Sequence, residues 1–103
     1  MADLMSQFLK LGCNISDDIR ILKMEAQLGI KSYAIYLKIL LNMRMAIGLR
    51  LQNNPKKIAK LIGYPRKWKL VKRIIEDYDL FEIDEAGFIH SKYLKQQEVD
   101  RWQ

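Results

Sequence analysis

Residues 54–91 read NPKKIAKLIGYPRKWKLVKRIIEDYDLFEIDEAGFIHS, and this stretch predicts a helix-turn-helix followed by a β-hairpin. A capping asparagine precedes a proline at the first helical position, where the missing proline N–H costs nothing. The short helix over 56–62 is expected to end at Gly63, and a second helix is expected over 65–78. Two helices joined by a tight turn that contains glycine are typical of a helix-turn-helix.

Two apolar segments follow, at 80–83 and 88–90, and the turn Asp84-Glu85-Ala86-Gly87 separates them. They predict a β-hairpin, which in this position is the wing of a winged helix-turn-helix. Residues 49–52 alternate apolar and polar side chains and would complete a three-stranded sheet. The predicted fold class is therefore α+β, mostly α with a small β-hairpin: a winged helix-turn-helix with extra N-terminal and C-terminal helices.

Helices are also expected on both sides of this unit. Ser16, followed by two acids, can cap a helix that ends at Gly29, and Ser32 can open a longer helix to residue 46 or 47. This longer helix is apolar almost all round, which predicts that it is the central and most buried one. Ser91 can cap a last helix that reaches Gln97.

The chain has 103 residues, half of them hydrophobic and 29% charged, which indicates one globular domain. We assign residues 1–14 to a partly disordered N-terminal segment and residues 15–103 to the winged-helix domain, which can be the N-terminal part of a longer protein. No apolar run approaches the ~20 residues of a membrane span, and the first residues do not resemble a secretion signal. One cysteine and one histidine provide neither an internal disulfide nor a zinc ligand set. We expect a cytoplasmic protein without cofactor, metal or membrane partner.

The charges are unevenly distributed along the chain. No acid lies between Glu25 and Glu76, yet twelve of the eighteen basic residues do, whereas eight acids follow from Glu76 to Asp100. This polarity predicts a polyanion as the partner of the middle segment. The alternative is a solvated basic face that keeps the protein soluble.

The second helix of the helix-turn-helix separates into two faces at about 100° per residue. The residues expected to face the core are Trp68, Val71, Ile74, Ile75 and Tyr78. The candidate DNA-binding residues on the opposite face are Arg66, Lys69, Lys72 and Arg73. Further candidates on the preceding helix are Lys56, Lys57 and Lys60, which could hold the flanking DNA backbone. Lys67 is also a candidate but falls on the core side, so it should either snorkel or precede the regular helix.

These residue types favour phosphate contacts, because the face offers two arginines and no Asn or Gln for reading bases. We therefore expect modest sequence specificity. The acids at the wing tip would repel phosphate, so the wing either stays off the DNA or contacts a protein. Glu76 is expected to pair with Lys72 and Arg73.

The remaining residues that could take part in catalysis, metal binding or base stacking are expected to have structural roles. His90 has no second histidine or cysteine nearby, and the spacing of Trp68 places it in the core. Cys13 is expected to be inert, and Trp102 is either exposed or covered by a missing segment. The acids over 76–85 lack the spacing of a calcium loop. We find no nucleophile–base pair, phosphate-binding glycine loop or metal triad, so we expect no enzymatic activity.

The chain resembles a known family over about residues 8 to 97. The motifs that carry the resemblance are DIRIL at 18–22, GIKSYAIY at 29–36, LFEID at 80–84, GF at 87–88 and SKYL at 91–94. They are similar to the Lin1244/Lin1753-like N-terminal domain of phage and prophage replication proteins, of the DnaD-related replisome-organiser type. Residues 8–11 lack the aromatic-His-Asp segment of many members, and members commonly continue into a further domain.

This resemblance implies a winged-helix DNA-binding domain that acts in replication initiation, binds origin DNA and recruits a helicase loader. The family's recognition helix corresponds to residues 65–75, which makes the four basic residues of that helix candidate DNA contacts. Two alternatives remain open: a transcriptional regulator, and a protein-interaction or homodimerisation module without DNA affinity. An enzyme is the least favoured alternative.

Overall fold

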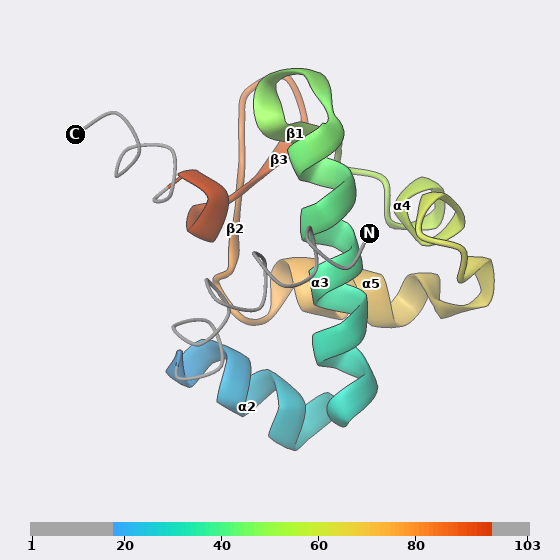
Figure 1. Cartoon of the computed structure of the whole chain (residues 1–103), viewed down its shortest axis with the longest axis vertical. Coiled ribbons are helices and arrows are strands. Elements are labelled where there is room, and N and C mark those ends of the chain that lie inside the picture. Colours follow the sequence, from blue (N-terminus) through green and yellow to red (C-terminus); the bar gives the residue numbers. More distant parts are fainter. Residues whose placement is uncertain (1–17, 96–103) are drawn as a thin grey trace, which may run out of the picture.

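A computed structural model of the chain describes residues 18–95 (Figure 1). The elements in chain order are α2 (Ile19–Leu28), α3 (Ile30–Met45), the 3₁₀ turn η1 (Ile47–Leu49), β1 (Arg50–Gln52), α4 (Pro55–Leu61), the 3₁₀ turn η2 (Pro65–Lys67), α5 (Trp68–Glu76), β2 (Phe81–Ile83) and β3 (Phe88–Ser91). The fold is α+β and mostly helical, as the sequence predicts. The order of elements from α3 onward agrees with the one expected for a winged helix-turn-helix.

The three strands form one antiparallel sheet in the order β1-β3-β2. Ile89 lies at its centre, opposite Leu51 on one side and Ile83 on the other, and its side chain is fully buried. The predicted hairpin and the predicted third strand are both confirmed. Because β3 lies between them, β1 and β2 are the two edges of the sheet.

Helix α3 is the centre of the core, also as predicted. In Figure 1 it runs vertically, with α2 at its lower end, α5 crossing it and the sheet at its upper end. Ile39, Leu40 and Met43 are fully buried on this helix. Tyr36 packs edge-to-face against Phe81 of β2, with ring centroids 5.7 Å apart, so α3 and the sheet share one core.

Two predicted helix caps differ from the structure. Helix α3 begins at Ile30 rather than after Ser32, whose buried hydroxyl donates a hydrogen bond to the Gly29 carbonyl at 2.6 Å. Gly29, at φ +89°, is both the C-cap of α2 and the N-cap of α3, so a single residue joins the two helices. Helix α2 is capped by Asp18, which accepts from the Arg20 N–H at 2.8 Å. The cap is thus one of the two acids that follow the predicted capping residue, Ser16, which lies outside the described residues.

The remaining boundaries differ by a few residues. The second helix of the helix-turn-helix opens as the 3₁₀ turn η2, becomes regular at Trp68 and ends at Glu76, two residues before the predicted end. Asp79 adopts φ +56°, where the chain turns toward β2. The Ser91 hydroxyl accepts from the Leu94 N–H at 3.1 Å, which confirms it as a cap. The last helix is described over 92–95; its predicted end and the segment 1–14 lie outside the described residues.

Candidate nucleic-acid interface

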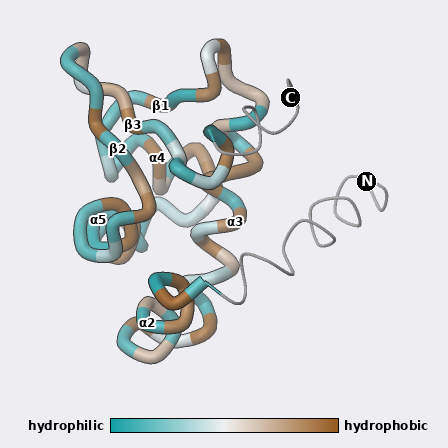
Figure 2. Tube along the Cα trace, turned by 90° about the vertical axis from the view of Figure 1, so that its left-hand side faces the viewer, coloured by the Kyte–Doolittle hydropathy of each residue, from teal (hydrophilic) through white to brown (hydrophobic). Residues whose placement is uncertain are grey.

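Helices α4 and α5 pack against each other and leave their outer faces open. Ile58 and Ala59 of α4 and Ile74 of α5 are buried in the common core. The turn between the helices depends on Gly63, at φ +90°, after which the Tyr64 N–H donates to the Ala59 carbonyl at 2.8 Å. Figure 2 shows the hydrophilic side of α5 facing away from the rest of the molecule.

All eight candidate DNA-binding residues are exposed, and we call them together the basic surface. Its members are Lys56, Lys57 and Lys60 on α4, Arg66 and Lys67 in η2, and Lys69, Lys72 and Arg73 on α5. Lys67 precedes the regular helix, which is the second of the two positions expected for it. The structure brings seven of these residues into three groups rather than one continuous row, and Arg66 belongs to none of the three.

The first group surrounds Trp68. The ammonium of Lys56 lies 4.8 Å from the centre of the indole ring, and that of Lys69 lies 5.7 Å from it. A depression of about 450 Å³ beside this ring is lined by Lys69, Lys72 and Arg73 and also by Glu76 and Asp77. The expectation that Trp68 faces the core is only partly right, because the residue is half-buried at the edge of the core. Its ring also contacts two cations from different helices.

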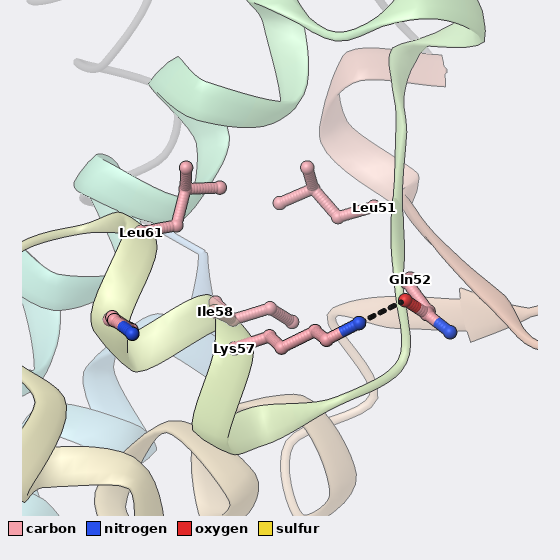
Figure 3. A pocket seen from close by; sticks show the side chains of 6 residues that line it. Leu51, Gln52, Lys57, Ile58 and Leu61 are labelled. Carbon is pink, nitrogen blue, oxygen red and sulfur yellow. Dashed lines mark hydrogen bonds between the residues drawn. The ribbon is translucent and has the colours of Figure 1, made fainter.

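The second group lies on the other side of α4. Lys57 and Lys60 border a groove of about 420 Å³ between β1 and α4, lined also by Leu51, Gln52, Ile58 and Leu61. In Figure 3 the side chain of Lys57 extends toward β1, where its ammonium donates to the Gln52 side-chain oxygen at 3.4 Å. We call this groove the β1–α4 groove. Lys57 and Lys60 are therefore separated from the Trp68 group.

The third group joins the basic surface to α3. Lys67 lines a pocket of about 330 Å³ together with Lys31, Ala34, Ile35, Lys38 and Tyr64, which we call the Tyr64 pocket. Sequence reasoning did not select Lys31 and Lys38 as site residues. Their spacing of seven residues, two helical turns, places them on one face of α3 and could have indicated a second basic stripe.

Acids neutralise little of the basic surface. Arg73 pairs with Asp77, one turn away, at 3.3 Å, so the predicted pairing of Lys72 and Arg73 with Glu76 is wrong. The other seven cations have no carboxylate partner within residues 18–95. A spacing of four residues brings the Asp77 carboxylate beside the guanidinium. Lys72 and Glu76 have the same spacing but form no ion pair, so spacing alone does not decide which residues pair.

The acidic wing tip is less repulsive than its sequence suggests. The Asp84 carboxylate accepts from the backbone N–H groups of Ala86 and Phe88, both at 2.9 Å, which shapes the turn. It also lies 2.8 Å from His90 Nε2 and 3.4 Å from the Arg50 guanidinium. The hydrogen bond to His90, followed by those from the backbone, lowers the pKa of Asp84 to about 2. His90 thus has a structural contact, and of the two tip acids only Glu85 is left without an ion-pair partner among the described residues.

Residues 18–95 contain neither a candidate metal site nor a candidate membrane span. No group of three or more His, Cys, Asp or Glu side chains there could hold a metal ion. The longest helix of this region, α3, has 16 residues, and none of its helices has the length and apolar character to cross a bilayer.

The domain belongs to the class of α+β domains with an open cationic face. Its basic surface is exposed over two packed helices, next to a small antiparallel sheet. Residues 8–94 match the family model described as Lin1244/Lin1753-like, N-terminal. The match covers most of the chain, and the protein belongs to this family. Comparisons with curated proteins and with solved structures found no match.

Proposed function

We propose that this protein is a non-catalytic winged-helix domain that binds duplex DNA through the basic surface. The observation that carries the proposal is the set of seven exposed cations without carboxylate partners on α4, η2 and α5. Such a surface exchanges condensed counterions on DNA for ammonium and guanidinium groups, which provides most of the affinity of non-specific binding.

The distribution of charge along α5 indicates how the helix would approach DNA. Arg66 lies in η2 just before the helix and Lys69 in its first turn, whereas Glu76 is its last residue and Asp77 follows it. The N-terminal residues of a recognition helix enter the major groove in helix-turn-helix proteins. The basic end of α5 would therefore enter the groove, and the acidic end would point away from the phosphates.

Sequence specificity should be modest. Arg73 shares its guanidinium with Asp77, which leaves Arg66 as the arginine of the basic surface that is free for a bidentate contact with guanine. The lysines would contact phosphates, which fix the register of the protein on DNA without reading its sequence.

Membership of the Lin1244/Lin1753-like family supports a role in phage-type replication initiation, in the cytoplasm, as a replisome organiser related to DnaD. In this role the domain would hold duplex DNA at an origin while a helicase loader assembles beside it. A transcriptional regulator would use the same surface. Co-sedimentation of the DNA-bound protein with a purified helicase loader would favour the replication role.

Fluorescence anisotropy of labelled duplex DNA at several salt concentrations tests the proposal. Four or five neutralised phosphates give a slope of about −4 in a plot of log K against log salt. The Trp68 group and its neighbours in η2 are sufficient for this number. Absence of binding even at low salt would exclude the function.

The β1–α4 groove favours a second candidate, a protein-interaction or homodimerisation module. Its apolar side chains lie beside β1, an edge strand, and the Leu61 side chain is 56% exposed. Light scattering would detect a dimer that resists salt, and Leu61→Glu should dissociate it. A monomer at all salt concentrations would count against this candidate.

A further inference from the structure

The Tyr64 pocket has the size and the lining of a small binding site. Its volume of about 330 Å³ is at the lower end of the range for ligand pockets. Ala34 and the buried Ile35 contribute aliphatic surface, and Tyr64 contributes an aromatic ring that is 45% exposed. A flat, partly apolar group could therefore reach the ring.

The rim of this pocket selects anions. Lys31 and Lys38 border it from α3 and Lys67 borders it from η2, while none of the lining residues is acidic. None of these three lysines has a carboxylate partner within residues 18–95. Three ammonium groups around one opening would attract a phosphate group.

Lys38 and Tyr64 are positioned together. The ammonium of Lys38 lies 5.2 Å from the centre of the Tyr64 ring, in a cation–π contact. A phosphate bound by Lys38 would therefore bring an attached base within reach of the aromatic ring. An aromatic ring next to backbone-binding cations is the arrangement that single-stranded nucleic acids use, because every base has a face that can stack.

The pocket adjoins the basic surface, since Lys67 belongs to both and follows Arg66 directly. We propose that the Tyr64 pocket binds an unpaired nucleotide of a single-stranded extension, while the basic surface holds the adjoining duplex. This inference rests on the proposed function for its duplex half. The domain would then recognise the junction between double-stranded and single-stranded DNA.

The experiment compares three labelled DNAs by anisotropy at fixed salt. The first is a blunt duplex, the second carries an oligothymidine extension of about six nucleotides, and the third carries an extension of equal length without bases. The third DNA controls for added phosphates. The variants are Tyr64→Ala, which removes the ring, Tyr64→Phe, which keeps it together with the cation–π contact, and Lys38→Ala, which removes one ammonium group.

The wild-type protein should bind the thymidine extension about fivefold or more tightly than the extension without bases, as expected for one base stacked on an aromatic ring. Tyr64→Ala should abolish this difference without changing the affinity for the blunt duplex, and Tyr64→Phe should retain it. Oligothymidine alone should shift the NMR resonances of the Ala34 and Tyr64 amides, which tests the pocket without any duplex.

Equal affinity for the two extensions, with unshifted Ala34 and Tyr64 resonances, would overturn the inference while leaving duplex binding intact. The inference would also be overturned if Lys38→Ala lowered the affinity for all three DNAs equally and Tyr64→Ala had no effect. The lysines would then contact duplex phosphates. Loss of duplex binding with retained oligothymidine shifts would exclude the proposed function but not the pocket.

Discussion

Replacing Lys69 and Lys72 with alanine tests the basic surface most directly. Both side chains are exposed on α5, and neither has a carboxylate partner among the described residues. Surface substitutions of this kind change stability by less than about 0.5 kcal/mol, so the fold should persist. Any loss of DNA affinity can then be assigned to the lost charges, provided that the thermal midpoint is unchanged.

The expected loss follows from counterion release. Each phosphate contact contributes a slope of about −0.9, which at 0.1 M salt corresponds to about 0.9 decades of affinity. Removing two contacts should therefore weaken binding roughly 60-fold at 0.1 M salt and reduce the slope from about −4 to about −2. Anisotropy titrations at four or more salt concentrations measure both quantities.

Lys23→Glu provides a control that is matched in net charge. Lys23 is exposed on α2, outside the basic surface, and its reversal changes the net charge by the same two units as the double variant. It should leave the salt slope unchanged. An unaltered slope in the double variant, or equal weakening by Lys23→Glu, would refute the assignment of DNA binding to α5.

Three further predictions concern the fold. The pKa of Asp84 is about 2 against an ordinary 3.8, so its ionised form stabilises the fold above pH 3.8, and this contribution is lost as the pH falls toward 2. Asp84→Asn should flatten this part of a plot of thermal midpoint against pH. An unchanged plot would contradict the assignment. Gly63→Ala should lower the free energy of unfolding in urea by about 1–2 kcal/mol, because φ is +90°. A Cβ at this position would meet nothing within 4 Å, so the cost comes from the backbone conformation alone. An unchanged free energy of unfolding would exclude this conformational cost. Ile39→Ala, at a fully buried site, should cost about 2–5 kcal/mol in the same assay, and a cost below 1 kcal/mol would contradict the central place of α3.

The order of elements could be predicted from sequence because local signals mark it. Asn54 caps α4 through a hydrogen bond from the Lys57 N–H at 3.2 Å, and the following proline occupies the first helical position, as expected. The cap of α3 was missed because a serine close to a helix start has two options. Ser32 could have capped from outside the helix, but it lies in the first turn of α3, where its buried hydroxyl bonds back to the Gly29 carbonyl instead.

The candidate site was predicted less completely, because a helical wheel describes one helix at a time. The wheel correctly predicts that Lys69 and Lys72 are exposed, but it cannot show that Trp68 also contacts Lys56 of the preceding helix. The Tyr64 pocket combines residues from α3 and η2 that are about thirty positions apart in sequence. Only packing of α3 against the helix-turn-helix brings those lysines to the same opening.

The pairing of charges explains how a basic middle and an acidic end can coexist on one small domain. The sequence predicts that the wing repels DNA, since two acids, Asp84 and Glu85, lie at its tip. In the structure, Asp79 pairs with Lys92, and Glu82 pairs with Lys95 at 3.2 Å. These acids are thus neutralised largely by the basic residues of the last helix rather than by the basic surface.

Arg50 completes this arrangement. Its guanidinium reaches the Asp84 carboxylate and lies over the Phe88 ring, 4.1 Å from the ring centre, so a cation from β1 is held at the tip of the wing. Surface ion pairs of this kind add little stability. Their effect is electrostatic instead: they reduce the negative field of the wing tip and leave the cations of the basic surface available. If this reasoning is right, Arg50→Ala should lower the affinity for duplex DNA without removing a DNA contact. The loss of affinity should be smaller in the Asp84→Asn background, where the carboxylate is already removed. Equal losses in both backgrounds would instead indicate that Arg50 contacts phosphate itself.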